Sequence, residues 1–408
     1  MNVRVKKQLL RIVIVALALA GCRDVVDAPV TAVSDVPPDH ANAPSEGAST
    51  AAARSITFTV SGLQITLTDL GVLPNGTFST ARVINNGSEV AGLGNVPGTT
   101  SWDWQVTTWS ANTKAVLSTR PYTGAIPEQR NDNGEMAGTN CIGGCGRLYK
   151  GIFWDAAGNE TQLQGLGGTD RLYLDEHVMA HAINAVGQIA GAAKDETTSR
   201  PTHAVIWQNK DVLPTDLGFL GKGAYVDYSE AYGINGVTHV VGVGQVGSTN
   251  RAFLWRNGKL IDIGALSGQV VAEAYAINNT GIIAGKSNFY PVIWTYDVTN
   301  ASSVPRIKQL PIPAGFFSAQ PTSVNDAGDV VGYAGSPNID AHAVLWRAGS
   351  AFDLGVWPGG TYSVAAEING LGQIVGTGTV AADGLDHALL WTVAAGGGGG
   401  GGAKPRRR

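Results

Sequence analysis

One pattern of apolar and polar residues recurs along most of the chain. An aliphatic residue is followed by Asn, two variable residues, Gly, one variable residue, two aliphatic residues and a closing Gly, as in INAVGQIAG from Ile183. Consecutive copies lie 43 to 53 residues apart. The Asn of the seven copies stands at Asn85, Asn131, Asn184, Asn235, Asn278, Asn325 and Asn369. Two copies are degenerate, because Arg130 replaces the first aliphatic residue of one and Thr238 replaces the turn Gly of another.

This pattern is typical of a β-hairpin. Asn favours the first position of a type I turn, where its side chain can bond the backbone two residues on, and Gly at the fourth position accepts a left-handed conformation. The aliphatic pair predicts a buried strand, and the closing Gly predicts a bulge or a close approach. We therefore interpret the repeated Asn as a structural turn residue. Two copies, NDNGE and NDAGD, are similar in composition to calcium loops but lack the ligand spacing of such loops.

A second phrase ends in Trp about twenty residues after each Asn, at Trp109, Trp154, Trp207, Trp255, Trp294, Trp346 and Trp391. We expect these Trp residues to pack between neighbouring units. A third phrase, such as TDLG or FDLG, follows several of them, at Leu217, Ile263 and Leu354. Each repeat therefore supplies about four short strands, which is the size of a propeller blade. The sequence predicts an all-β, seven-bladed β-propeller of four-stranded blades over residues 55–394.

The two ends of the repeat region predict how the ring closes. The last copy stops at Trp391-Thr-Val without the third phrase, whereas an extra copy of that phrase, QITLTDLG at residues 64–71, precedes the first Asn. We expect this N-terminal strand to complete the seventh blade. Closure of this kind removes two open sheet edges.

The two repeated phrases, INxxGxVVG and HALLW from His387, together resemble the extracellular HAF repeat family. The quoted copies cover roughly residues 64–392. The resemblance implies an exported repeat protein for which no biochemical activity is agreed.

The N-terminal segment resembles the signal peptide of a bacterial lipoprotein. Residues 1–21 have four basic residues and an apolar run, and they end in Leu-Ala-Gly before Cys22. The resemblance implies cleavage before Cys22 and lipidation of its thiol, and acyl chains there would anchor the protein stably in a membrane. Because Arg23 follows, the outer membrane is favoured if the host is Gram-negative. Residues 22–54 have no aromatic residue and predict a disordered tether.

Composition narrows the classes of partner. Gly accounts for 55 of 408 residues and charged residues for 15%, which suits short strands and tight turns. Eight of the 28 basic residues lie near the two termini, so the rest of the chain has 20 basic and 32 acidic residues and is negatively charged. Nucleic acid is therefore an unsuitable partner. The tail at residues 395–408, a Gly run and four basic residues, either contacts anionic lipid or has no role.

Few residues suggest chemistry. Cys141 and Cys145 predict a local disulfide, with two free thiols as the alternative, and no other Cys completes a metal site. His203, His342 and His387 share one repeat position; they would bind a metal only if they faced the channel, and strand alternation places them instead beside the blade Trp. Trp102, Trp104 and Trp357 lie off the repeat positions and are candidates for sugar contact.

The sequence favours a binding protein over an enzyme. It contains no catalytic signature and implies no cofactor or metal. The leading hypothesis is an envelope-anchored, monomeric binding or scaffolding propeller for a protein or a glycan, with specificity in loops 97–104 and 170–179. The alternatives are an extracellular polysaccharide hydrolase or lyase with its site at the channel mouth, and a structural envelope component.

Overall fold

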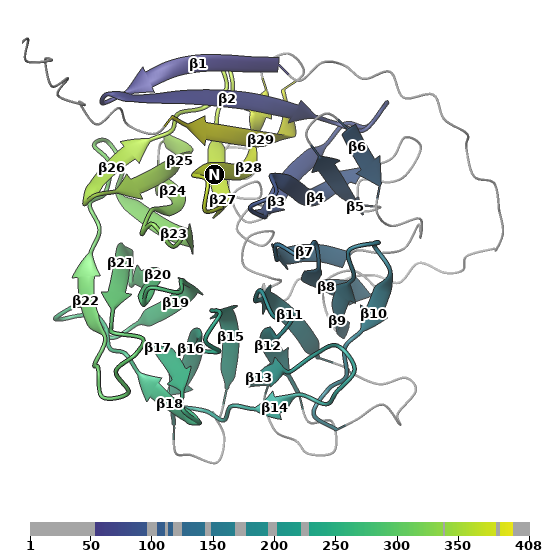
Figure 1. The fold of residues 1–408 in the computed structure, drawn as a ribbon. Coiled ribbons are helices and arrows are strands. Elements are labelled where there is room, and N and C mark those ends of the chain that lie inside the picture. Colours follow the sequence, from purple (N-terminus) through teal and green to yellow (C-terminus); the bar gives the residue numbers. More distant parts are fainter. Residues whose placement is uncertain are drawn as a thin grey trace, which may run out of the picture.

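A computed structural model describes residues 54–95, 104–110, 113–116, 125–142, 148–167, 177–194, 202–221, 228–337, 339–380 and 384–394. These residues form strands and connecting turns around a central axis (Figure 1). No helix in these ranges is long and apolar enough to cross a membrane.

The strands form seven antiparallel sheets, the blades of a β-propeller, so the predicted fold class is confirmed. The innermost strands of blades one to seven are β3 (Ser79–Ile84), β7 (Ala125–Arg130), β11 (Val178–Ile183), β15 (Ser229–Ile234), β19 (Ala272–Ile277), β23 (Ser318–Val324) and β27 (Ser363–Ile368). The second strands are β4 (Glu89–Asn95), β8 (Met136–Ile142), β12 (Ile189–Ala193), β16 (Val240–Val246), β20 (Ile282–Ser287), β24 (Val330–Ser336) and β28 (Gln373–Val380).

The third strands are β5 (Trp104–Ser110), β9 (Leu148–Trp154), β13 (His203–Trp207), β17 (Thr249–Arg256), β21 (Tyr290–Thr295), β25 (Ile339–Arg347) and β29 (Leu385–Val393). The outer strands of the first six blades are β6 (Thr113–Val116), β10 (Glu160–Gln162), β14 (Thr215–Asp216), β18 (Lys259–Asp262), β22 (Arg306–Gln309) and β26 (Ser350–Asp353). Because each inner strand ends at a repeat Asn, all seven Asn turns lie on one face, here called the turn face. The inner strands begin at the opposite face, the start face.

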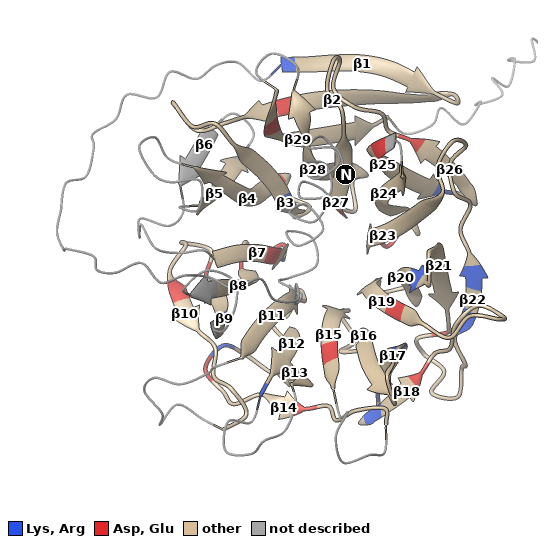
Figure 2. Cartoon of the chain, turned by 180° about the vertical axis from the view of Figure 1, so that it is seen from behind, with Lys and Arg blue, Asp and Glu red and all other residues tan. Residues whose placement is uncertain are grey.

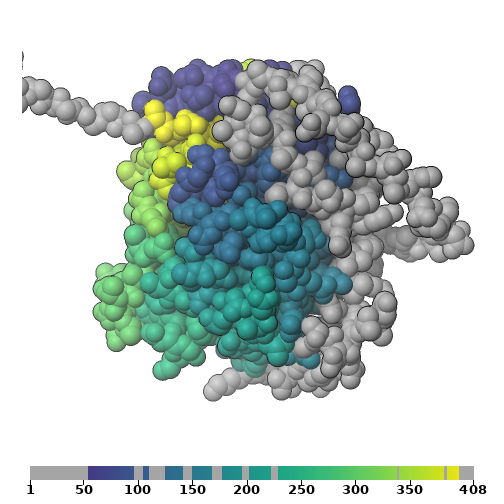
Figure 3. Space-filling model, turned by 45° about the vertical axis from the view of Figure 1, so that its right-hand side comes forward, coloured from purple at the N-terminus to yellow at the C-terminus, as the bar shows by residue number. Residues whose placement is uncertain are grey.

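The ring closes as the sequence predicts. The N-terminal strand β2 (Leu63–Gly71) pairs antiparallel with β29 and so becomes the fourth strand of blade seven, in the place that the outer strand has in the other blades. Purple and yellow segments accordingly lie side by side in Figures 1 and 3. The sequence did not predict a further strand, β1 (Arg54–Val60), which pairs with β2 and gives this blade five strands.

The core lies between the blades. Each hydrophobic cluster combines residues of neighbouring sheets; for example, Phe153 of blade two packs with Ile183 and Trp207 of blade three. Six of the seven repeated Trp side chains are buried, and Trp255 is partly buried. The expected place of these residues between units is therefore confirmed.

The Asn turns have the expected backbone. The fourth position has a positive φ in all seven turns, and the degenerate copy uses Thr238 there with φ 63°. In the first copy Gly87 stands one residue early, so that Ser88 adopts the left-handed conformation, with φ 59°.

The closing Gly of each repeat lies opposite a bulge in the inner strand. The inner strand of every blade contains an irregularity three residues before its Asn, for example between Ala231 and Gly233. A Cβ on Gly242 would lie 1.9 Å from the backbone oxygen of Glu230, and the six equivalent glycines make the same approach at 1.9 to 2.1 Å. The predicted close approach is confirmed, because only Gly fits beneath the bulged strand.

Candidate functional site

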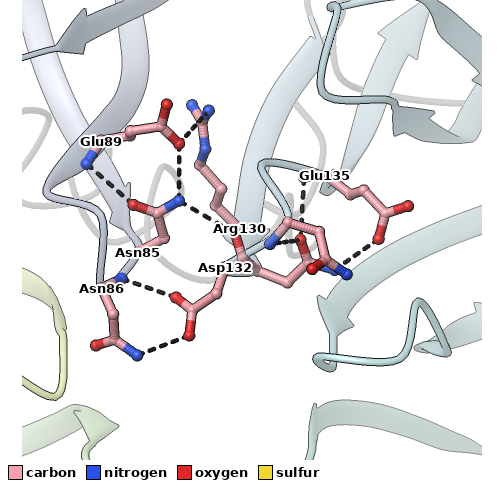
Figure 4. Close-up of polar contacts among 8 residues, drawn as sticks. Asn85, Asn86, Glu89, Arg130, Asp132 and Glu135 are labelled. Atoms are coloured by element: carbon pink, nitrogen blue, oxygen red, sulfur yellow. Dashed lines mark hydrogen bonds and ion pairs between the residues drawn. The ribbon is translucent and has the colours of Figure 1, made fainter.

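The seven repeat asparagines form a closed hydrogen-bonded ring on the turn face. Each Nδ2 donates to the backbone oxygen of the corresponding Asn in the next blade, at 2.8 to 3.2 Å, and Asn369 of the last blade donates to Asn85 of the first. The Asn side chains are 3 to 6% exposed. Figure 4 shows the link from Asn85 to blade two.

The other amide atom of each Asn holds its own turn. Asn184 Oδ1, for example, accepts from the backbone N–H groups of Val186 and Gln188 at 3.2 and 3.0 Å. The sequence interpretation of the Asn as a turn residue is therefore confirmed, but it missed the bond between blades. The signal was the presence of Asn, and no other turn-former, in all seven copies: Asp has no N–H to donate.

The Asn ring surrounds a pocket of about 200 Å³. At its rim, the residues that follow the Asn make a second set of contacts. Asn86 binds Asp132 through a backbone N–H and Nδ2, both at 2.8 Å (Figure 4). Asn279 binds Asp326 in the same way, at 2.8 and 2.9 Å. Arg130, the degenerate position, pairs with Glu89 at 2.8 Å. Burial lowers the pKa of Arg130, although the Glu89 carboxylate opposes this shift.

Below this pocket, a partly buried carboxylate joins three blades. Glu367 Oε2 accepts from the backbone N–H of Ile84 at 2.7 Å, and its side chain also bonds Gln129. Burial raises the pKa of Glu367 to about 8, and these two hydrogen bonds oppose the shift. The side chain is therefore mostly protonated at neutral pH. Gln129 Oε1 in turn accepts from Ile183 N–H, at 3.0 Å.

Calcium is not supported in the NDAGD copy. Both carboxylate oxygens of Asp329 accept from Arg347, at 2.9 and 2.6 Å. In the described ranges no group of three or more His, Cys, Asp or Glu side chains is arranged to hold a metal ion.

Towards the start face, a cluster of acidic, aromatic and imidazole side chains lies on the inner strands of blades three and four. Glu230 Oε1 lies 2.7 Å from His181 Nε2, and Glu230 Oε2 accepts from the hydroxyls of Tyr228 and Tyr232. Glu230 and His181 are 6 and 7% exposed. Acidic residues on the inner strands β15, β19 and β7 are visible in Figure 2.

Blade five repeats this arrangement at the next carboxylate. Glu273 Oε2 accepts from Tyr275 at 2.6 Å and lies 3.3 Å from Lys286 Nζ, while Oε1 accepts from Asn250 of blade four at 3.1 Å. The rings of Tyr232 and Tyr275 are 6.0 Å apart, so the two groups form one cluster. We call these residues the start-face cluster. Sequence reasoning missed it, because its members come from three blades: Glu230 lies 49 residues from His181 and 43 residues from Glu273.

The three repeated histidines do not share a site. His203, His342 and His387 lie on the third strands of different blades, and each Nδ1 lies 2.8 to 3.1 Å from a carboxylate of the outer strand: Asp216, Asp353 and Asp69. The structure therefore shows a carboxylate partner for each imidazole, which the sequence did not predict. The Asp of the third phrase, DLG, is that partner.

The sugar-contact prediction is wrong for Trp357. This side chain is 7% exposed and packs in the core cluster of blades six and seven, with Arg54 over its ring at 5.8 Å. The N-terminal hairpin brings Arg54 there, which the sequence could not show. Trp104 is partly exposed and stacks on Phe78, with ring centroids 5.8 Å apart.

Several predicted features lie outside the described residues: the signal segment with Cys22, the tether, Trp102, Cys145, most of loops 97–104 and 170–179, and the tail. Cys141 lies in β8, but its side chain is also outside the description. Lipidation, the disulfide and loop specificity therefore stay predictions.

The chain was compared with known proteins in sequence and in fold. No protein-family model and no curated protein matches the chain. A puromycin hydrolase structure aligns at 12% identity and a TM-score of 0.47, over 74% of this chain and 50% of the hydrolase. TolB from Acinetobacter baumannii aligns at 10% identity and a TM-score of 0.41, over 75% of this chain and 80% of TolB. The Aleuria aurantia lectin, in a complex with a fucoside, aligns at 9% identity and a TM-score of 0.38, over 79% of this chain and 96% of the lectin. This chain thus spans about half the length of the hydrolase.

Proposed function

We propose that this chain is an envelope-anchored, non-catalytic propeller that binds or scaffolds a protein or a glycan at its start face. The observation that carries the proposal is the start-face cluster. Its two carboxylates are held by His, Tyr, Asn and Lys partners before any ligand arrives. Side chains fixed by hydrogen bonds on rigid strands suit recognition, because little conformational freedom is lost on binding.

The proposed location rests on the lipoprotein-like segment that ends at Cys22. If Cys22 carries acyl chains, replacing it with Ser prevents membrane attachment. We expect the wild-type chain to partition into the detergent phase of a phase-separating detergent, and Cys22→Ser to remain in the aqueous phase. Detergent-phase partition of Cys22→Ser would contradict the anchor without affecting the binding proposal.

A hydrolase or lyase acting on extracellular polysaccharide is the second candidate. It is favoured by the pair Glu230 and Glu273, which occupy the same position in neighbouring blades with His181 beside the first. Two carboxyl groups of different proton affinity are the usual catalytic requirement of glycosidases.

One experiment separates the two functions. The mature chain is immobilised and incubated with a cell-envelope extract divided into polysaccharide and protein fractions, with heat-denatured chain as the control. Binding without catalysis predicts saturable retention of material from one fraction with no new reducing ends or unsaturated sugars. Product formation that disappears in both Glu230→Gln and Glu273→Gln would overturn the binding proposal, as would the absence of retention from both fractions.

A further inference from the structure

The start face carries an exposed aromatic pair beside the start-face cluster. Phe289, in the turn between β20 and β21, is 66% exposed, and Phe317, just before β23, is 67% exposed. Their ring centroids are 6.5 Å apart and their planes are inclined at 49°. Large apolar side chains exposed next to each other on a soluble surface indicate a binding site more often than isolated ones do.

Hydrogen bonds fix the backbone at Phe317 and at Asn288, the residue before Phe289. Asn288 N–H donates to Val271 oxygen at 3.1 Å, and Phe317 N–H bonds both Gly335 oxygen and Ser336 Oγ, at 3.1 and 2.8 Å. Val270, 59% exposed, lies one residue from the first of these bonds. The two rings therefore form a preorganised apolar platform across blades five and six.

Polar groups lie on the axis side of this platform. Lys286, which pairs with Glu273, is three residues before Phe289 on the same hairpin, a separation of roughly 10 Å along a strand. Glu273 also accepts from Asn250 of blade four, so one buried carboxylate orients an amide and an ammonium group. These partly exposed groups, and not the buried Glu273, are the ones that a ligand would contact.

We infer that the ligand of the start face is a neutral oligosaccharide, which lies on Phe289 and Phe317 and hydrogen-bonds Asn250 and Lys286. This inference rests on the proposed binding function. Sugar rings have apolar C–H faces and polar hydroxyl edges, so they match a site of aromatic side chains with a few fixed polar groups.

Two observations favour this ligand over others. Lys286 is neutralised by Glu273, and Glu230 lies in the same cluster, so an acidic polysaccharide would meet negative charge. A protein partner usually covers about 800 Å² on each side, with several anchoring side chains at the centre. Two rings and one Val form a smaller platform than that, whereas it suits one or two sugar units.

Affinity electrophoresis tests the inference. The full mature chain is run in native gels that contain hydroxyethylcellulose, glucomannan or glycol chitin. We expect at least one polymer to retard it, and the double variant Phe289→Ala/Phe317→Ala to lose at least tenfold in affinity. Asn250→Ala is expected to weaken the same retardation without changing the thermal midpoint of unfolding.

The matched control is Leu371→Ala, because Leu371 is 63% exposed but lies in an Asn turn on the opposite face. This variant should be retarded like the wild type. The carbohydrate inference would be overturned if none of the three polymers retarded the wild-type chain. It would also be overturned if the double Phe variant were retarded as strongly as the wild type. If the protein fraction of the envelope extract is nevertheless retained, the binding function stands and only the ligand class is wrong.

Discussion

At the scale of single residues, the repeat Asn performs two functions with one amide. Its oxygen accepts the backbone N–H groups of its own turn, and its nitrogen donates to the next blade. Either function alone is available to other residues, but the combination is particular to Asn, because Asp and Ser lack the N–H₂ group. The result is that every turn on this face also connects two blades.

The closing Gly gives a residue-scale prediction with a control in the same strand. In Gly332→Ala, the new Cβ would lie 2.0 Å from the backbone oxygen of Gln320. We expect a loss of more than about 3 kcal/mol in the free energy of unfolding, because the bulged strand must move. Gly335 of the same strand has open space around it, so Gly335→Ala should stay within about 0.5 kcal/mol of the wild type. Urea denaturation measures both; equal stability of the two variants would contradict this account.

Glu367 predicts a dependence of stability on pH. Its folded-state pKa is raised to about 8, so between about pH 4.5 and 8 the unfolded chain has released this proton while the folded chain retains it. Stability from this group is therefore complete below that range and decreases as the pH rises through it. The total effect is on the order of 5 kcal/mol.

Glu367→Gln should remove this dependence, because Gln is neutral and its oxygen can still accept from Ile84 N–H. We expect the urea midpoint of the variant to exceed that of the wild type at pH 8 to 9 and to approach it at pH 5. A wild-type midpoint that does not fall relative to the variant between pH 5 and 9 would refute the assignment.

At the scale of elements, the pairing of a third strand with an outer strand explains two repeated phrases at once. The His of HAVIW or HALLW lies on the third strand, and the Asp of DLG lies beside it on the outer one. In blade seven the two partners are 318 residues apart, because β2 comes from the N-terminal end of the ring. The same local contact therefore also closes the molecule.

Asp69→Ala should consequently destabilise the ring more than Asp216→Ala does. Burial alone would raise the pKa of Asp69, but hydrogen bonds to His387 and Arg54 outweigh burial and lower the pKa. The ionised carboxylate therefore stabilises the folded state at pH values above its ordinary pKa, and this stabilisation is lost as the pH falls through the lowered pKa. Asp69 is 3% exposed, whereas Asp216 is 39% exposed and lies in a blade of consecutive strands. Thermal unfolding at pH 7 compares them, and a larger effect of Asp216→Ala would contradict the proposed closure.

At the scale of the whole molecule, two interactions close the circle. On the outside, β2 pairs with β29, and near the axis the Asn ring passes from Asn369 to Asn85. Closure by β2 leaves β29 paired on both sides, which limits association through the edge of that strand.

Moving the segment that forms β2 to another place in the chain tests whether the position of β2 in the sequence matters. Moving residues 63–71 to follow Ala394 places β2 directly after β29, where Ala394 N–H already bonds Gln64 oxygen at 3.0 Å. We expect this rearranged chain to be a folded monomer with near-native circular dichroism, since the same β2–β29 strand pairs form. Deletion of residues 54–71 should instead expose β29 and cause aggregation, seen by size-exclusion chromatography. A monomeric, fully stable deletion variant would show that closure by β2 is dispensable.

The number of blades, the four repeated strands of each and the closing strand could be predicted from the sequence. These follow from patterns within one repeat, where neighbouring residues decide turn type and strand alternation. The extra copy at residues 64–71 and the missing phrase after Trp391 were enough to predict closure. By contrast, β1 has no counterpart in the repeat and was not predicted.

Which residues of different blades meet could not be predicted from the sequence and depends on how the blades pack. The bond from one Asn to the next, the burial of Trp357 and the meeting of Glu230 with His181 each join strands that the repeat pattern treats separately. The exposed pair Phe289 and Phe317 likewise depends on how two blades face each other. The physical reason is that repeat periodicity fixes each blade, whereas the contents of the start face depend on the residues that break the repeat.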